Sequence, residues 1–220
     1  GRTDGIITYG SNLDNEELFH YMAKQPVPCV FIEGGPDNGN CNRIQIDNEQ
    51  GAYEATRYLI AQGRKNIIHV TGDMNYTASL ERLNGFVHAM RDSHIPITAD
   101  SILYADFFEE SAYRQITELL ERDIHPDAVF AGADKTAYGV LRALMNAGIS
   151  IPGETAVIGF DDDTPDSRDI IFPGLSTMRQ PMYEMGCAAV ELLLAAIRDP
   201  AHQPETRCFQ PHLILRETCK

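Results

Sequence analysis

The sequence predicts an α/β fold built on parallel β-sheet. Two observations predict it: short, continuously apolar runs alternate with longer amphipathic segments, and the connections between them are short. Runs such as CVFI (29–32) and AVIGF (156–160) are typical of strands that are buried on both faces. Strands that alternate with helices indicate right-handed crossovers between parallel strands.

The pattern places each element in turn. The predicted strands span residues 5–8, 28–32, 66–71, 101–104, 127–131 and 155–160. A shorter run at 43–46 is either another strand or a connection. The predicted helices span residues 15–24, 48–62, 79–93, 109–122, 136–147 and 182–198. In the second helix, Asn48 can cap the start and Gly63 ends an apolar stripe.

The last part of the chain departs from this alternation. After Phe160, an irregular segment extends to Gly174. A short LSTM run (175–178), a long helix and a final strand near 209–215 follow. Such a tail can return to an earlier layer, which suggests two lobes that share the chain.

Composition and charge restrict the function. The chain has 220 residues, of which 43% are hydrophobic and 23% are charged, as in ordinary globular proteins. A net charge of -14 repels phosphate backbones, so these residues by themselves are poor candidates for binding nucleic acid. No run approaches the roughly 18 apolar residues of a membrane helix, and no leader sequence is evident, so we expect a cytoplasmic protein.

Several motifs of enzymes and metal proteins are absent from the sequence. It has no GxGxxG after a strand, no P-loop ending in GK[ST], no GxSxG and no HExxH. Its five cysteines form no CxxC, which favours unpaired thiols in a reducing compartment, and its seven histidines show no ligand spacing. We therefore expect no metal, no cofactor and no enzymatic activity.

Polar and aromatic residues follow the predicted strands. In open α/β sheets, ligands bind at the carboxyl ends of the strands. The residues there are five carboxylates and two aromatics: Glu33, Asp73, Asp106, Asp134, Asp161, Tyr9 and Phe107. Carboxylates accept hydrogen bonds from hydroxyl groups, and a ring covers the apolar face of a sugar or purine. Arg82 can balance their charge, so we predict a pocket for a small hydroxylated or aromatic ligand at one edge of the sheet.

Each of these residues also has a structural explanation. Asp134 is explained equally well as the N-cap of the following helix. Tyr9 and Phe107 could fill the core. Asp162 and Asp163 are better explained as solvated loop residues than as ligands.

Four segments resemble the LacI/GalR family of bacterial transcriptional regulators. They are DNEQGAYEATRYLIAQGRKNIIHVTG (47–72), ERLNGFVHAM (81–90), PDAVFAGADKTAYGVLRALMNAGISIPGETAVIGFDD (126–162) and PGLSTMRQPMYEMGCAAVELLL (173–194). The resemblance implies an effector-binding core of two Rossmann-like lobes with parallel sheets, similar to type I periplasmic binding proteins. It also implies that a small molecule, often a sugar or nucleobase, binds in the cleft between the lobes.

The resemblance assigns ligand contacts position by position. The arginine of an RxxGF-type motif falls on Arg82, and the aspartate of the GFDD motif falls on Asp161. Asp134 matches the aspartate of an Asn-Asp pair whose amide is replaced here by Ala133. Phe107 matches the aromatic that stacks on the ligand. An acidic strand-end residue of the N-lobe falls on Glu33. With Tyr9, which follows the first predicted strand, the predicted ligand site consists of Arg82, Asp161, Phe107, Asp134, Glu33 and Tyr9.

The resemblance also divides the chain. It implies a partial N-lobe at 1–46, a C-lobe at 47–178, a return to the N-lobe at 179–207 and a final C-lobe strand at 208–220. Family members carry a helix-turn-helix headpiece, a hinge helix and a first strand-helix-strand that have no match here. We therefore expect a fragment with an incomplete N-lobe, whose operator DNA contacts belong to a missing headpiece.

Three functions from different classes fit these patterns. The first is the effector-sensing core of a repressor, dimeric through its lobes, in which a ligand alters the spacing of the headpieces. The alternative is a periplasmic sugar-binding receptor of an ABC transporter. The third is a sugar-modifying α/β enzyme, for which no nucleophile or paired base is identifiable. Arg82 and Lys135 leave a phosphorylated ligand open.

Overall fold

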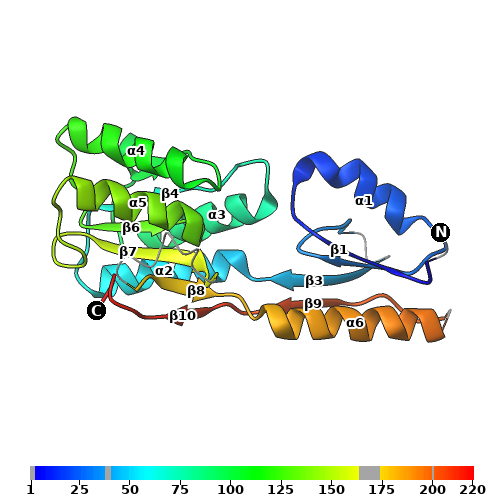
Figure 1. Ribbon diagram of the computed structural model, residues 1–220. Helices are drawn as coiled ribbons and strands as arrows, with labels where there is room; N and C mark the ends of the chain where they lie inside the picture. The colour runs from blue at the N-terminus through cyan, green and yellow to red at the C-terminus, as the bar shows by residue number, and fades with distance from the viewer. Residues whose placement is uncertain (1–2, 38–40, 164–173, 200) are drawn as a thin grey trace. The chain divides into compact units, whose positions relative to one another are not determined.

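The computed structural model describes residues 3–37, 41–163, 174–199 and 201–220 (Figure 1). The chain forms two compact units, each with its own sheet. Unit 1 comprises Gly1–Asp47, Asn75–Ala78 and Pro181–Gln210, and unit 2 comprises Asn48–Met74, Ser79–Gln180 and Pro211–Lys220. The predicted lobe boundaries stay a prediction. Most of the irregular segment predicted before Gly174 lies outside the described residues.

Unit 1 is a four-stranded parallel sheet with one helix packed on each face. Its strand order is β1 (Ile6–Tyr9), β2 (Cys29–Ile32), β3 (Asn42–Ile46) and β9 (Thr206–Phe209). Helix α1 (Glu16–Ala23) covers one face through Phe19, which packs edge-on against Phe31. Helix α6 (Met182–Arg198) covers the other face through Met185 and Leu192.

Unit 2 is a six-stranded sheet in which only the last strand of the chain is antiparallel. Its order is β10 (His212–Ile214), β8 (Ser176–Arg179), β7 (Ala156–Asp161), β6 (Ala128–Ala131), β4 (Ile67–Val70) and β5 (Ile102–Leu103). The five strands from β8 to β5 are mutually parallel, so their carboxyl ends lie at one edge. Every residue of β4 and β6 is buried, as the continuous apolar pattern predicts.

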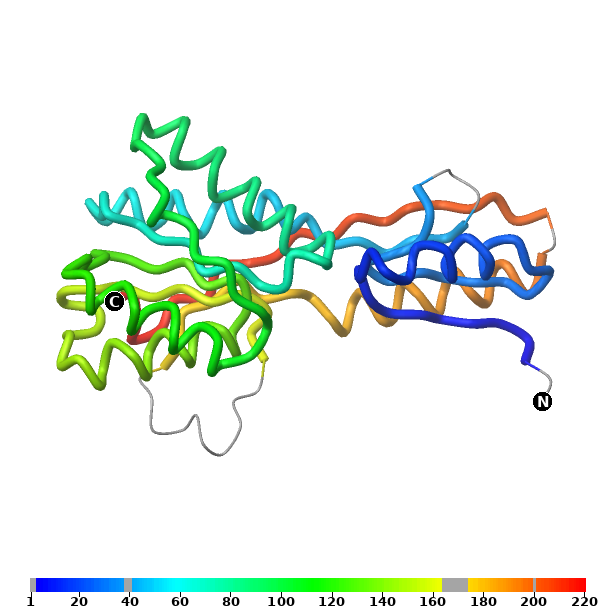
Figure 2. Tube along the Cα trace, turned by 90° about the horizontal axis from the view of Figure 1, so that it is seen from above, coloured from blue at the N-terminus to red at the C-terminus, as the bar shows by residue number. Residues whose placement is uncertain are grey.

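Four helices cover the two faces of this sheet. Helices α4 (Glu109–Glu121) and α5 (Asp134–Asn146) pack on one face around Ile116 and Leu141. Helices α2 (Asn48–Ala61) and α3 (Thr77–Asp92) pack on the other face around Leu59 and Phe86, and Figure 2 shows the two pairs on opposite sides of the strands. None of the described helices is long and apolar enough to cross a membrane.

Glycines allow close approach within both helix pairs. A Cβ atom placed on Gly85 of α3 would lie 2.1 Å from the carbonyl oxygen of Glu49 in α2. A Cβ on Gly139 of α5 would lie equally close, at 2.1 Å, to the carbonyl oxygen of Glu109 in α4. Each pair is therefore packed backbone against backbone, which leaves no room for a side chain.

The structure confirms the predicted α/β fold with parallel sheets and settles two details. Residues 43–46, left open between a strand and a connection, belong to β3. The strand predicted near 209–215 is found as β10, whereas β9 just before it was not predicted and pairs in the other sheet. Gln210 and Pro211 separate them, and Pro211 has no N–H to continue a ladder.

Candidate functional site

The carboxyl edge of the six-stranded sheet gathers most of the predicted polar residues. Asp161 ends β7, and Gln180 directly follows β8. Gly132 follows β6, and Asp134 begins α5 two residues later. Because these strands are parallel neighbours, the residues that follow them lie close together at this edge.

Arg82 of α3 is buried at this edge and bonded to three different elements. Its Nε donates to Asn48 Oδ1 at 2.9 Å, and its Nη1 donates to the carbonyl of Gly132 at 2.6 Å. Its Nη2 lies 3.3 Å from Asp161 Oδ1, and the guanidinium carbon lies 3.7 Å from the centre of the Phe160 ring. The side chain is only 4% exposed, so the fork is held entirely by protein groups.

Asp161 is bonded from two sides and has an unusual backbone. Its Oδ1 accepts from Gln180 Nε2 at 2.5 Å as well as facing Arg82, and its side chain is 23% exposed. Burial raises the pKa of Asp161 above its ordinary value, although the Arg82 charge opposes this. Its φ of 116° lies in the region that favours glycine, and such strain in a non-glycine residue is typical of functional sites.

Asp134 does not cap α5. Ala133 is the N-cap residue, and Asp134 is the first residue of the helix. Its carboxylate instead accepts from Thr177 Oγ1 at 2.6 Å and from the backbone N–H of Asp163 at 2.9 Å. Burial raises the pKa of Asp134 to about 7, and the nearby Asp161 adds to the effect. Asp134, which follows β6, is thus bonded to β8 and to the segment after β7.

Phe107 lies in the loop after β5 and packs on a neighbouring strand end. A Cβ atom on Gly72, which follows β4, would lie 2.2 Å from its ring. The backbone N–H of Phe108 bonds to Asp106 Oδ1 at 2.8 Å, which fixes the start of this loop. Phe107 therefore lies at the same sheet edge as Asp134 and Asp161, next to the end of β4.

Tyr9 and Glu33 belong to the other sheet. Tyr9 ends β1 and is 58% exposed, and Glu33 follows β2 with a φ of 61°. The prediction that all strand-end residues meet at one sheet edge is wrong, because the strands belong to two sheets in two units. Strands of both sheets have similar apolar sequences, so periodicity could not separate them.

Asp162 is not a solvated loop residue. Its two oxygens lie 2.6 Å from Arg179 Nε and 2.7 Å from Arg216 Nη2, and its side chain is 12% exposed. Hydrogen bonds from both arginines hold the pKa of Asp162 below its ordinary value despite some desolvation. Asp163, in contrast, has an exposed side chain.

Three groups of this site were not among the predicted residues. Asn48 was expected to cap α2, but its side chain bonds Arg82 and also Glu81, whose Oε2 lies 3.0 Å away. Gln180 stands in the RQP segment, where only its place after a strand could have suggested it. Gly132 contributes a backbone carbonyl, which no residue type indicates.

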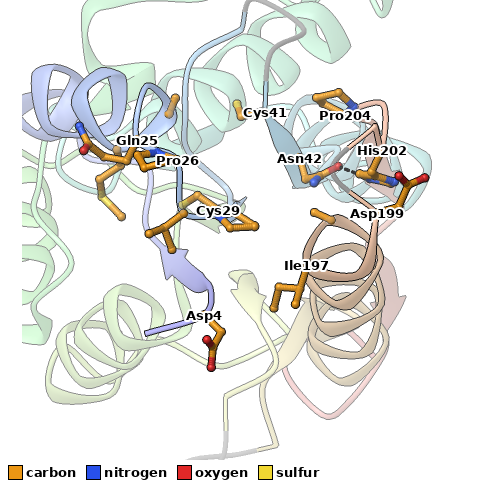
Figure 3. A pocket seen from close by; sticks show the side chains of 15 residues that line it. Asp4, Gln25, Pro26, Cys29, Cys41, Asn42, Ile197, Asp199, His202 and Pro204 are labelled. Carbon is orange, nitrogen blue, oxygen red and sulfur yellow. Dashed lines mark hydrogen bonds between the residues drawn. The ribbon is translucent and has the colours of Figure 1, made fainter. Parts of the chain in front are cut away.

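A separate cavity of about 460 Å³ lies in unit 1, at the amino ends of its strands (Figure 3). Cys29, Cys41 and Asn42 line it, and His202 Nε2 lies 3.2 Å from Asn42 Oδ1. No predicted ligand contact lines it. Among the residues described, no group of three or more potential ligands is arranged to hold a metal ion.

Comparison with known families identifies the fold. A model of the periplasmic binding protein-like domain matches residues 56–219. The chain belongs to this family. The matched region contains Arg82, Phe107, Asp134, Asp161 and Gln180, and of the residues of the unit 2 site named above only Asn48 precedes it.

Two proteins similar in sequence to this chain are transcriptional repressors. The chain is 33% identical over 220 residues to the HTH-type transcriptional repressor PurR of Vibrio parahaemolyticus, and 32% identical to PurR of Actinobacillus pleuropneumoniae. The whole chain aligns, and it spans 65% of the length of each relative. The resemblance to LacI-type regulators predicted from the motifs is thereby confirmed.

Two solved structures resemble the chain throughout. One is the transcriptional regulator CelR in complex with cellobiose, with 28% identity and a TM-score of 0.85 over 99% of this chain and 66% of that one. The other is a LacI family transcriptional regulator from Enterococcus faecium with bound ribose, with 27% identity and a TM-score of 0.83 over 98% of this chain and 79% of that one. These relatives favour the regulator over the transport receptor.

Proposed function

We propose that this chain is the effector-binding core of a LacI-type transcriptional regulator and that its ligand binds at the carboxyl edge of the unit 2 sheet. The observation that carries the proposal is the buried Arg82–Asp161 pair at the ends of parallel strands. A buried charge pair is weak evidence for stability, because its desolvation offsets its attraction. Its position at the ligand-binding edge of an α/β sheet, on a strained backbone, favours a binding role.

The ligand is a small sugar or nucleoside-like molecule. Carboxylates at the sheet edge accept hydrogen bonds from hydroxyl or N–H groups, and Phe107 offers an aromatic face beside them. The relatives bound to cellobiose and ribose support this class. The role is binding and not catalysis, since the carboxylates of Asp134 and Asp161 are bonded within the protein and none is paired with a nucleophile.

The relatives extend the proposal to the whole regulator. Ligand binding would shift the equilibrium between two states of a homodimer, and so change its affinity for operator DNA in the cytoplasm. The acidic chain described here would leave DNA contacts to basic residues elsewhere in such a regulator. Tyr9 and Glu33 remain proposed ligand contacts of the regulator.

A ligand screen tests the site. D-ribose, cellobiose and adenosine are added to the protein in a thermal-shift assay, and affinities of those that stabilise it are measured by calorimetry. Asp161→Ala is expected to weaken binding by at least about 10-fold, because a buried ligand donor loses its charged acceptor. Asp163→Ala is the control, since this neighbour has an exposed side chain. Equal affinities of the Asp161 variant and the wild type would refute the site.

A further inference from the structure

The cavity of unit 1 contains none of the residues proposed to bind the effector. The residues that line its volume of about 460 Å³ all belong to unit 1, so it is formed within one compact unit. Its walls are the ends of α1 and α6, the start of β3 and the segments that lead into β2 and β9 (Figure 3). Cavities of this size take small organic molecules.

Asn42 gives the cavity a hydrogen-bond donor of fixed orientation. The residue lines the cavity and is 4% exposed, and its Oδ1 accepts from the backbone N–H of Glu205 at 3.0 Å. Because a backbone N–H only donates, this bond assigns the oxygen and the nitrogen of the amide, and His202 Nε2 must also donate to that oxygen. The amide nitrogen donates to no residue that the structure describes. A ligand with an acceptor group would satisfy it.

The carboxylates at the cavity have no basic side chain beside them in its lining. Asp4 and Asp199 line the cavity, and neither lysine nor arginine is found among the described residues that do so. Asp199 Oδ1 accepts from the backbone N–H of Ala201 at 2.9 Å, which supplies no counter-charge. Both carboxylates are exposed, so salt screens their attraction for a cation. They therefore favour a cationic ligand by a moderate factor.

Much of the remaining wall is apolar. Met22, Val27 and Ile197 contribute to it, and such a surface favours a ligand with an apolar body. Cys29 and Cys41 line the same cavity. Burial and the neighbouring Cys41 raise the pKa of the Cys29 thiol to about 11, which makes it a weak nucleophile at neutral pH. The cavity is thus suited to reversible binding.

We propose that this cavity is a second ligand site, which binds a small organic cation with an apolar body and a hydrogen-bond acceptor. The acceptor bonds to the amide nitrogen of Asn42, the body packs on the apolar walls, and the positive charge lies near Asp4 and Asp199. The site shares no residue with the proposed effector site, so the two proposals stand or fall separately.

Three molecules with the same phenol ring and different charges test the selection. At pH 7 tyramine is a cation, tyrosol is neutral and 4-hydroxyphenylacetate is an anion. In calorimetry at low ionic strength, tyramine is expected to bind about fivefold more tightly than tyrosol and the anion more weakly than either, with a smaller preference at high salt. Equal affinities for the three molecules, or no binding of tyramine at millimolar concentration, would overturn the proposal.

Alkylation of cysteines locates the bound tyramine. Cys29 lines the cavity, whereas Cys187 and Cys208 are exposed and do not line it. Labelling with iodoacetamide in mildly alkaline buffer is followed by peptide mass spectrometry. Saturating tyramine should slow labelling of Cys29 by at least about threefold and leave the other two rates unchanged. Equal rates at Cys29 with and without tyramine would contradict binding in this cavity.

Two pairs of substitutions test the named groups. Asp4→Asn should weaken tyramine by about threefold and leave tyrosol unchanged, whereas Asp14→Asn, the same change at an exposed residue outside the cavity, should alter neither.

Ala196→Phe fills the cavity from α6 and should reduce tyramine binding at least about 10-fold, and Val190→Phe, on the exposed part of the same helix, is its control. Circular dichroism checks that each variant folds. Unchanged tyramine affinity in both Asp4→Asn and a folded Ala196→Phe would overturn the site.

Discussion

The buried His69 should make the stability of unit 2 depend on pH. Its ring is fully buried in β4 and stacks against Phe86 and Phe130, with centroid distances of 5.3 Å and 4.9 Å. Nδ1 lies 2.9 Å from the carbonyl of Phe130, and Nε2 has no partner among the described residues. A proton on Nε2 would thus place an unpaired charge in an apolar core, so we expect His69→Leu to abolish a pH effect seen in the wild type.

The magnitude follows from the two pKa values of this residue. Burial, helped by the Arg82 charge, lowers the pKa of His69 from 6.5 to about 4 in the folded protein. Between these values the unfolded chain binds more protons than the folded one, so stability rises with pH. The contribution is complete above pH 6.5 and is lost as the pH falls towards 4. A difference of about 2.5 in pKa corresponds to about 3 kcal/mol.

The assay is urea unfolding followed by circular dichroism between pH 4 and pH 7.5 for both proteins. The stability of the wild type minus that of His69→Leu should increase by about 3 kcal/mol across this range. Taking the difference removes the contributions of other titrating groups, which both proteins share. Parallel profiles would refute the reasoning, because they would mean that the folded state accepts a proton on His69 without cost.

The other predictions concern charge and packing in unit 2. Asp134, with a pKa of about 7, changes stability with pH in the direction opposite to His69. Between about pH 4 and 7 the folded state binds more protons than the unfolded state, so the stability that Asp134 contributes falls as the pH rises. This contribution is about 4 kcal/mol at pH 4 and is lost by pH 7. In urea titrations, the stability of the wild type minus that of Asp134→Asn should therefore fall by about 4 kcal/mol between pH 4 and pH 7. Arg82→Leu leaves the Asp161 carboxylate without its counter-charge and the Gly132 carbonyl without the Arg82 donor, and should lower the free energy of unfolding by about 3–5 kcal/mol. Gly85→Ala should lower the thermal midpoint by several degrees because its Cβ meets a backbone oxygen, whereas Gly186→Ala, with no atom within 4 Å, should raise it slightly.

The elements were readable from the sequence because each is specified locally. Continuous apolar runs gave β6 and β7, and amphipathic spacing gave α2 and α6, with ends close to those observed. The division into two sheets is a long-range property, since β3 pairs with β9, more than 150 residues later. The irregular tail suggested two lobes, but only the resemblance to a known family assigned segments of the chain to each of them.

The candidate site was predicted residue by residue, but its bonds were not. Asp161 was chosen as an acid after a strand, and Arg82 was chosen to balance the charge of the strand-end acids as a group. Their pairing depends on partners distant in sequence, Asn48 and the carbonyl of Gly132, that complete the guanidinium fork. Capping explained Asp134 equally well from sequence, because N-cap and first-turn positions favour the same residue type.

The backbone of Asp161 links fold and function most directly. A glycine at φ 116° would avoid the strain, which in a non-glycine residue costs about 1–3 kcal/mol. The chain carries an aspartate there and a second positive φ, of 62°, at Asp162. The arginines around Asp162 anchor the segment from the other side. Two strained acids in succession are thus held by three arginines, and the conformation leaves one oxygen of Asp161 directed to neither Arg82 nor Gln180. Stability alone does not account for this arrangement, whereas an acceptor presented to a ligand does.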